Sequence, residues 1–262
     1  MDKSLSTLYL VIPVLNEAPN LPRLSESLRA TTASFQDRYR THIIFVDDGS
    51  IDDTVKAIAA NCHDLETSIV RHEINQGPGY AFGSAFEYLS ERLKPGDWVC
   101  TMEGDNTSNI DLLNQMFQRT GEGYEVIFAS PYMYGGGFTN TDFFRRFFSF
   151  MANTYVREFL GIPGIFTVSS FFRLYKAEVI QALQKIYGKR IIASKGFECM
   201  IELTMKLVFR NSMISEVPMV LDSNKRIGKS KMKKLKTVWG YIQVGLQRNS
   251  WQRLYQQNRL HE

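Results

Sequence analysis

The chain has 262 residues, of which 44% are hydrophobic and 22% charged, and this composition excludes a disordered, collagen-like or long coiled-coil protein. No apolar run approaches the roughly 18 to 20 residues that cross a bilayer, and the N-terminus lacks the apolar core of a signal peptide. The net charge of +4 is uneven, because residues 222–262 hold ten Lys and Arg side chains against two acidic ones, which favours an anionic partner or a solvated helix face there.

The first 130 residues alternate short β-branched runs with amphipathic stretches, which is typical of repeated β-α units and a mostly parallel sheet. We expect an α/β fold whose ligands bind beyond the carboxyl ends of the strands. The predicted strands are Leu8–Val14, His42–Val46, Glu66–Arg71, Trp98–Met102 and Glu125–Ala129. The predicted helices between them are Asn20–Thr32, Asp53–Asn61, Gly79–Arg92 and Ile110–Thr120.

The composition changes after residue 130, where three consecutive glycines lead into an aromatic, arginine-bearing stretch at 142–160. The three cysteines are widely spaced and form no C-x-x-C, so they predict neither a disulfide framework nor a zinc cluster and fit a cytoplasmic protein. The later pattern predicts strands near Phe171–Leu174 and Met213–Val217, and helices near Ala177–Tyr187 and Phe197–Phe209.

Acidic side chains follow three of the predicted strands: Asn16-Glu17 after the first, Asp47-Asp48 after the second and Glu103-Gly104-Asp105 after the fourth. Because the carboxyl ends of parallel strands meet at one edge of a sheet, we expect these carboxylates to converge. No G-x-G-x-x-G follows the first strand and the chain has no P-loop, which excludes those two kinds of nucleotide site.

Four motifs in this half, VIPVLNE, VDDGSIDDT, NQGPGYAFGSAF and TMEGDNTSN, resemble the successive signatures of family 2 glycosyltransferases. The second half resembles the dolichol-phosphate mannose synthase and polyprenyl-phosphate glycosyltransferase branch through RRFFSFMAN, SSFFRLY, GFECMIEL, SEVPM and RIGKSK. The resemblance implies an α/β GT-A fold, with a mostly parallel sheet flanked by helices and with amphipathic interface helices. It places the catalytic domain at 1–231, followed at 232–262 by a basic amphipathic helix without a transmembrane segment.

The resemblance implies a metal site, because Glu103 and Asp105 lie where the family has Asp-x-Asp. A diphosphate leaving group calls for a divalent cation, and hard cations such as Mg²⁺ or Mn²⁺ take carboxylate oxygens. Glu103 is a departure that lengthens the first ligand by one methylene. The alternative is a pair of solvated loop carboxylates.

The nucleotide of the sugar donor is expected beside these carboxylates. Asp47 and Asp48 can accept hydrogen bonds from base and ribose groups, although the same residues also make a good turn and helix start. Gly77 and Gly79 either allow the nucleotide to approach the backbone closely or form a strand-to-helix turn. The resemblance gives the nucleotide pocket to Pro13, Leu15, Glu17, Asp47, Asp48, Gly77, Gly79 and Gly104.

The acceptor site is implied by the second half of the chain. The resemblance places Arg145, Ser149, Arg226 and Lys231 around an acceptor phosphate, and arginine and lysine suit phosphate oxygens. The phenylalanines flanking Arg145 suit a helix in a bilayer interface, with an ordinary buried helix as the alternative. The lysines at 233, 234 and 236 are expected to face anionic lipid.

The chain departs from the branch at two places: Ser130-Pro131-Tyr132 lacks the usual arginine, and Thr167-Val168-Ser169-Ser170-Phe171 lacks the usual acid and glycine. The predicted function is metal-dependent, inverting transfer of a sugar from a GDP- or UDP-sugar to a polyprenyl phosphate on the cytoplasmic membrane face, without nucleic acid. One alternative is transfer to a hydroxyl, with Glu198 or Glu202 as base. The other is a nucleotide-sugar-binding pseudoenzyme.

Overall fold

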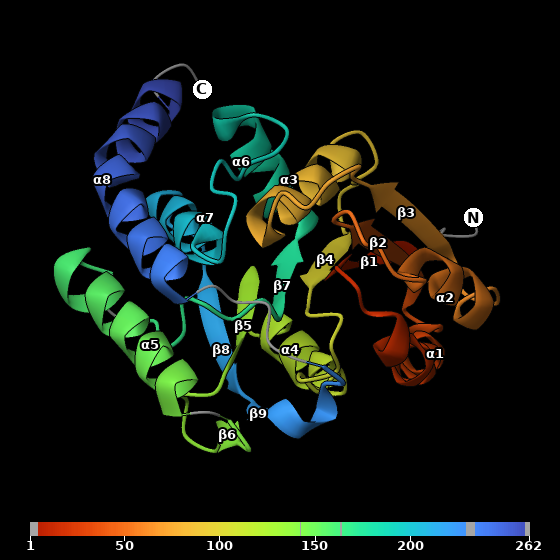
Figure 1. The fold of residues 1–262 in the computed structure, drawn as a ribbon. Coiled ribbons are helices and arrows are strands. Elements are labelled where there is room, and N and C mark those ends of the chain that lie inside the picture. The colour runs from red at the N-terminus through yellow and green to blue at the C-terminus, as the bar shows by residue number, and fades with distance from the viewer. Residues whose placement is uncertain (1–4, 142, 163, 229–233, 260–262) are drawn as a thin grey trace.

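The structure is a computed structural model that describes residues 5–141, 143–162, 164–228 and 234–259. A seven-stranded sheet crosses the molecule in the order β3-β2-β1-β4-β7-β5-β8, with helices on both faces (Figure 1). Its strands are β1 (Ser6–Val14), β2 (Tyr39–Asp47), β3 (Thr67–Arg71), β4 (Trp98–Thr101), β5 (Val126–Ser130), β7 (Arg173–Lys176) and β8 (Ile214–Pro218). The order of the strands reverses between β1 and β4, which is where open α/β sheets form their ligand crevice.

The sheet is mixed, because β7 runs antiparallel to both β4 and β5 while the other neighbouring strands are parallel. The predicted strand at Phe171–Leu174 begins two residues too early. The Thr101 hydroxyl donates to the Phe171 carbonyl at 2.6 Å, and the Phe172 amide donates to the Ser170 hydroxyl at 3.2 Å. These bonds make a turn, so the ladder starts only at Arg173.

The hydrophobic core has two layers, one on each face of the sheet. Alternate residues of β1 enter opposite layers, with Leu8, Leu10 and Ile12 in one and Tyr9 and Val11 in the other. The first layer is covered by α1 (Leu21–Phe35), α2 (Thr54–Asn61) and α4 (Leu112–Thr120). The second is covered by α3 (Pro78–Leu89), α6 (Ala177–Tyr187) and α7 (Cys199–Phe209).

Several elements differ from the sequence predictions at their ends. The helix predicted at Asn20–Thr32 is a 3₁₀ turn, η1 (Ala18–Asn20), followed by α1. The aromatic stretch forms α5 (Phe143–Thr154) and then a π-helical turn, η2 (Tyr155–Phe159). The small sheet of β6 (Gly137–Thr139) and β9 (Val220–Asp222) was not predicted, because each strand has only three residues and no periodic pattern.

The C-terminal helix α8 (Lys234–Arg259) packs against α5, α6 and α7. The Lys206 ammonium of α7 lies 4.6 Å from the Tyr187 ring centroid and 4.9 Å from that of Trp251 on α8, and it donates to Glu202 at 2.5 Å. The Tyr187 hydroxyl also donates to the Trp251 carbonyl at 3.1 Å. A buried ion pair enclosed by aromatic rings therefore joins α8 to the body of the fold.

The turn into α3 lies against the segment before α7 at backbone contact distance. The Gly79 amide donates to the Lys195 carbonyl at 2.9 Å, and a Cβ on Gly79 would lie 2.2 Å from the Ser194 carbonyl oxygen. Gly77 has φ +100°, and a Cβ there would lie 2.3 Å from the Lys195 carbonyl oxygen. Both glycines are thus required by the packing of two chain segments.

We predict that Gly79→Ala lowers the free energy of unfolding by about 1–3 kcal/mol, because the new methyl group has to displace the backbone of residues 194–196. Gly137→Ala is the matched control, since a Cβ there has no atom within 4 Å and should change stability by less than about 0.5 kcal/mol. Urea unfolding followed by circular dichroism measures both. Equal losses in the two variants would contradict the packing argument.

Candidate active site

Two carboxylates lie in the turn that follows β4. The Glu103 carboxylate accepts from the Ser108 hydroxyl at 2.8 Å. Asp105 is 5% exposed, and its Oδ1 accepts from the amide and the hydroxyl of Thr107 at 3.0 and 2.6 Å. Asn106 has φ +63°, which turns the chain sharply, and the next two residues, Thr107 and Ser108, donate back to the two carboxylates. The structure therefore places the two predicted metal ligands in one buried turn.

The Asp105 carboxylate is paired with a cation from a segment 121 residues further along the chain. Its Oδ2 accepts from Arg226 Nε at 2.6 Å and also from Arg226 Nη2. Burial opposes ionisation of Asp105, but the Arg226 charge and the Thr107 bonds outweigh it, so the pKa lies below its ordinary value. The carboxylate is ionised at neutral pH and attracts positive charge.

The route of the chain explains how Arg226 reaches this turn. The amide of Asp222, at the end of β9, donates to the Thr107 carbonyl at 3.2 Å, which brings the chain past the end of β4. The Asp222 carboxylate then accepts from the Asn224 amide at 3.1 Å and starts the 3₁₀ turn η3 (Ser223–Lys225). Arg226 follows directly, and Ile227 bonds to Asn20 through both backbone groups. Both ends of this segment are therefore anchored at the site.

Asp48, after β2, uses its carboxylate to hold the chain around Gly77. Its oxygens accept from the amides of Gln76 and Gly77 at 3.0 and 2.7 Å and contact His72 Nδ1 at 2.8 Å. His72 Nε2 lies 2.9 Å from the Ser84 hydroxyl. His72 was missed in the sequence analysis, although it lies between two of the recognised motifs. The structure thus shows a positioning role for Asp48, and a contact with ribose or base stays a prediction.

Asp47 is buried, and its Oδ1 accepts from the Ser50 amide at 3.0 Å, while Oδ2 lies 3.4 Å from Arg71 Nε. The Ser50 hydroxyl in turn accepts from the Asn16 amide at 2.9 Å. The Ile51 amide donates to Asn16 Oδ1 at 2.9 Å, and Asn16 has φ +49°. These bonds join the loop after β1 to the loop after β2. Arg71 was also missed, because nothing local distinguishes it from a surface arginine.

The remaining residues predicted to bind the nucleotide of the sugar donor lie at the end of β1 and on the loop after it. The amide of Glu17 donates to the Thr54 hydroxyl at 2.8 Å, and its carboxylate accepts from Asn20 at 2.5 Å. Pro13, on β1, is close to the turn after β4, since a Cβ on Gly104 would lie 3.2 Å from the Pro13 carbonyl oxygen. The structure therefore brings together the predicted nucleotide residues Pro13, Leu15, Glu17, Asp47, Asp48 and Gly104 at the ends of β1, β2 and β4.

The acceptor residues predicted from the sequence are placed only in part. The Ser149 hydroxyl, on α5, lies 3.3 Å from the Ser169 hydroxyl. Arg145 belongs to α5, but its side chain lies outside the described residues, and so does Lys231. Arg226 contacts Asp105, so in this structure it lies against the turn after β4 (residues 103–108), the carboxylate turn.

The two candidate bases differ in their surroundings. Glu202 is 0% exposed and accepts from the amides of Ala193 and Ser194 at 2.9 and 2.8 Å and from Lys206. Glu198 is partly exposed and accepts from the Gly196 amide at 3.0 Å. It lies close to α8, since a Cβ on Gly240 would lie 2.6 Å from the carboxylate. Both carboxylate oxygens of Glu202 therefore serve structural hydrogen bonds.

The turn near Thr167, which lacks the acid expected from the resemblance, contacts a carboxylate from another strand. Glu216, on β8, accepts from the amides of Phe166 and Thr167 at 2.7 and 2.9 Å. Burial raises the pKa of Glu216, while these two amides act in the opposite direction. Arg173 is fully buried nearby and donates to the carbonyls of Ser170 and Val168 at 2.8 and 2.7 Å. The altered turn is thus still held by charged side chains.

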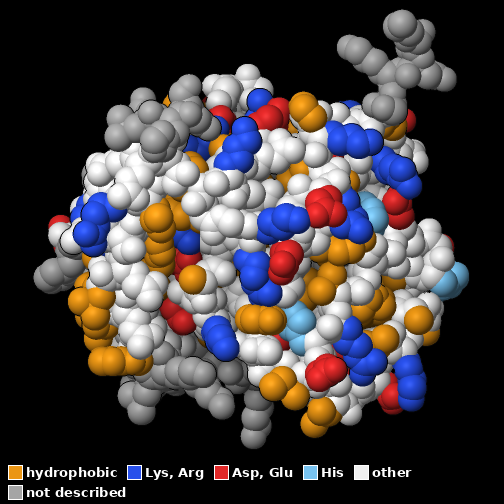
Figure 2. All heavy atoms as spheres, turned by 90° about the horizontal axis from the view of Figure 1, so that it is seen from above, with side chains coloured by type: hydrophobic (Ala, Val, Ile, Leu, Met, Phe, Trp, Pro, Cys, Tyr) orange, Lys and Arg blue, Asp and Glu red, His pale blue; other side chains and the backbone are white. Residues whose placement is uncertain are grey.

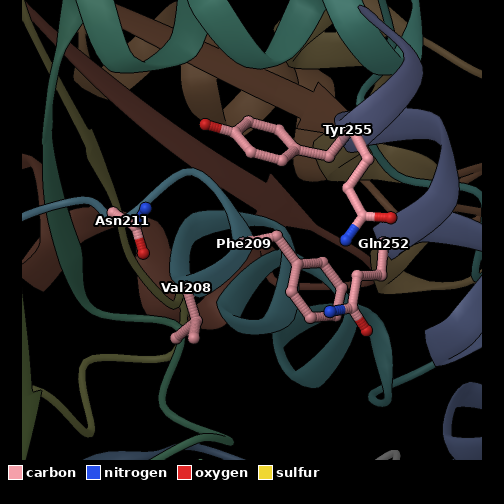
Figure 3. Close-up of a pocket in the computed structure, with 6 residues that line it drawn as sticks. Val208, Phe209, Asn211, Gln252 and Tyr255 are labelled. Atoms are coloured by element: carbon pink, nitrogen blue, oxygen red, sulfur yellow. The ribbon is translucent and has the colours of Figure 1, made fainter. Parts of the chain in front are cut away.

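Two surface hollows lie away from the carboxylate turn. A hollow of about 250 Å³ separates the end of α7 from α8 and is lined by residues such as Val208, Phe209 and Tyr255 (Figure 3). A shallower one of about 480 Å³ lies along α8 beside Asn249 and Arg253. Neither includes a residue of the carboxylate turn. On the face in Figure 2, Lys and Arg side chains lie next to Asp and Glu side chains, which is typical of a solvated surface.

The carboxylates in the turn after β4 fit a hard cation, provided that oxygens from outside the protein complete its coordination. Among the described residues, no group of three or more His, Cys, Asp and Glu side chains could hold a metal ion. Glu103 and Asp105 supply two carboxylates, and Asp105 already binds the guanidinium of Arg226. Carboxylate oxygens suit Mg²⁺ and Mn²⁺, so the remaining positions would be filled by phosphate oxygens or water.

Comparisons with known proteins show two curated relatives of similar sequence. The chain is 28% identical over 225 residues to polyprenol monophosphomannose synthase of Mycolicibacterium smegmatis, covering 85% of this chain and 79% of that protein. It is 25% identical to undecaprenyl-phosphate 4-deoxy-4-formamido-L-arabinose transferase of Yersinia pestis over 70% of this chain, but spans only about half, 53%, of that relative.

A solved structure has the same fold. Glucosyl-3-phosphoglycerate synthase of Mycobacterium tuberculosis, in complex with Mn²⁺, UDP-glucose and phosphoglyceric acid, superposes with a TM-score of 0.63 at 17% identity. The match covers 93% of this chain and 79% of that one, which confirms the predicted GT-A fold.

The sequence profile of Glycosyl transferase family 2 matches residues 9–184, which is more than half of the chain. This match confirms the resemblance to family 2 drawn from the motifs, and its range includes Glu103 and Asp105 but not Arg226. The chain therefore belongs to glycosyltransferase family 2 and is a sugar transferase of the GT-A fold.

Proposed function

We propose that this enzyme transfers one sugar from a GDP- or UDP-sugar to a polyprenyl phosphate at a membrane surface, with inversion at the anomeric carbon. The observation that carries the proposal is the Glu103 and Asp105 pair in the turn after β4, facing a basic segment that includes Arg226. The names of the two curated relatives, a polyprenol monophosphomannose synthase and an undecaprenyl-phosphate transferase, support the acceptor class.

The donor lies, in this proposal, across the ends of β1, β2 and β4. Glu17, Asp47 and Asp48 accept hydrogen bonds from the nucleoside, while Glu103 and Asp105 hold the Mg²⁺ or Mn²⁺. A bound divalent cation neutralises negative charge that develops on the leaving diphosphate. The solved glucosyl-3-phosphoglycerate synthase, which was crystallised with Mn²⁺ and UDP-glucose, supports the choice of donor and cation.

In the transfer step, an oxygen of the acceptor phosphate attacks the anomeric carbon and forms a new carbon–oxygen bond. The bond from that carbon to the diphosphate breaks, and the nucleoside diphosphate leaves with the electron pair. A phosphate monoester has a second pKa near 6 and is already ionised at pH 7, so the reaction needs no general base. The burial of Glu202 in a structural ion pair is consistent with a site that lacks one. Arg145, Ser149, Arg226 and Lys231 position the acceptor phosphate.

The membrane surface is proposed from an exposed apolar face on α5 and α8, the two helices that lie side by side in Figure 1. On α5 the exposed residues follow one helical stripe, and so do those on α8. Within the described residues, no helix is both long and apolar enough to cross a bilayer. The apolar face consists of Phe143, Phe147, Phe150 and Met151 on α5 and of Trp239, Ile242 and Leu246 on α8.

We predict that Asp105→Asn lowers the rate of transfer about 100-fold or more, because it removes the charge that holds the divalent cation. The rate is measured as nucleoside diphosphate released from a panel of UDP- and GDP-sugars with a short polyprenyl phosphate and Mn²⁺. The far-UV circular dichroism spectrum should stay that of the native enzyme.

Glu103→Asp is the matched control for that substitution. It keeps the carboxylate and restores the residue usual in the family, so activity should be retained. Native turnover in Asp105→Asn would show that the predicted metal position is wrong.

We predict that the double variant Trp239→Ser, Leu246→Ser binds vesicles of phosphatidylcholine and phosphatidylglycerol about tenfold or more weakly, because it removes two large apolar side chains from the face. The two side chains are 60% and 78% exposed, so their loss leaves the core intact. Co-sedimentation with the vesicles measures the effect.

Ile51→Ser provides the control. Ile51 is 94% exposed on the loop between β2 and α2, and α2 lies on the opposite side of Figure 1 from α5 and α8. Its substitution should leave vesicle binding unchanged. If both variants bind as tightly as the native enzyme, the face on α5 and α8 does not contact lipid.

A further inference from the structure

A buried asparagine, Asn20, joins the three segments that meet at the carboxylate turn. It is 1% exposed and lies in η1, directly before α1. Its Nδ2 donates to the Glu17 carboxylate at 2.5 Å, and its backbone carbonyl accepts from Asn106 Nδ2 at 3.0 Å. The side chain thus contacts the loop after β1, and the backbone contacts the turn that contains Asp105.

The same side chain holds the segment after η3. Asn20 Oδ1 accepts from the Ile227 amide at 2.9 Å, and Asn20 Nδ2 donates to the Ile227 carbonyl at 3.2 Å. A carboxamide that bonds to both backbone groups of one residue fixes the position and the direction of the chain there. The adjacent residue is Arg226, so Asn20 determines where the guanidinium can reach.

The Asp105 carboxylate has both oxygens engaged. Oδ1 accepts from Thr107, and Oδ2 accepts from Arg226. A divalent cation and a guanidinium at the same oxygen repel each other strongly in a buried site. A metal ion can therefore bind Asp105 only when the Arg226 side chain leaves it. The backbone need not move, because Ile227 is held by Asn20 and Asp222 by the Thr107 carbonyl.

We propose that Arg226 is exchanged for the divalent cation when the donor binds, and that Asn20 is the positioning residue that keeps the released arginine at the site. The inference rests on the metal site of the proposed function and adds an order of events to it. While Arg226 is bonded to Asp105, it is not available to an acceptor phosphate. Binding of the cation with the donor frees the guanidinium beside the reacting groups. Donor and acceptor sites are thus completed in sequence.

The exchange is tested by direct Mn²⁺ binding, measured from the electron paramagnetic resonance signal of free Mn²⁺, first without nucleotide and then with GDP or UDP. Arg226→Gln should bind Mn²⁺ about tenfold more tightly than the native enzyme without nucleotide, because the competing charge-assisted bonds are gone. Lys225→Gln removes the neighbouring charge, which acts on Asp222, and should shift the affinity less than about twofold.

The role of Asn20 is tested by hydrogen exchange at the Ile227 amide and by steady-state kinetics. Asn20→Ala should remove the protection of this amide and raise the KM for a short polyprenyl phosphate about tenfold, with a smaller rise in the KM for the donor through the lost bond to Glu17. If Asn20→Ala does not fold, Arg226→Gln tests the exchange on its own. Arg226 lies in a partly exposed segment, so this substitution should leave the fold intact.

The outcomes separate this inference from the proposed function. Equal Mn²⁺ affinity in the native enzyme, Arg226→Gln and Lys225→Gln would overturn the exchange while leaving the metal site in place. An Ile227 amide that is as well protected in Asn20→Ala would overturn the positioning role. No Mn²⁺ binding in any variant, with either nucleotide, would overturn the metal site and the exchange together.

Discussion

A buried carboxylate needs hydrogen bonds or a positive charge in place of water. The end of the sheet where we propose that the sugar donor binds is organised around supplying them to Asp105. Leaving an ionised carboxylate unpaired in a buried site costs several kcal/mol or shifts its pKa upward. Here Thr107 and Arg226 reverse that tendency. The short strand β9 and the turn η3 bring the arginine across 121 residues of sequence to do so. The ion pair between Arg226 and Asp105 therefore constrains the course of the chain from β9 to Arg226.

Asp48 meets the same requirement without a guanidinium. Two backbone amides and an imidazole surround its carboxylate, so the charge is used to shape the loop before α3. That loop in turn lies against residues 194–196, where Gly77 and Gly79 admit the close contact. The acidic residues of the site differ in this respect. Asp48 and Glu202 hold the framework, whereas Glu103 and Asp105 lie in the turn that faces the basic segment.

Much of the first half could be predicted from the sequence, because its signals are local. The predicted strand Leu8–Val14 lies within β1, and the motifs placed Asp105 and Glu103 correctly at the end of β4. The pairing of Arg226 with Asp105 could not be predicted in this way, since it depends on where two distant segments meet. The strand β7 was predicted, but its place between β4 and β5, antiparallel to both, could not be predicted for the same reason. The contact of Glu216 with the Thr167 amide joins segments that are 49 residues apart, so no local pattern shows it.

Two of the asparagines with positive φ, Asn16 and Asn106, lie at the site and restrict the sequences that it can tolerate. Most residues are strained in the left-handed region, and glycine is the usual substitute. Glycine would lose the side-chain bonds, from the Ile51 amide to Asn16 and from Asn106 to the Asn20 carbonyl. The carboxylate at position 103, by contrast, is a glutamate where the resemblance led us to expect the shorter aspartate. In this chain the two turn-forming amides are therefore under a narrower conformational constraint than one of the carboxylates that they position.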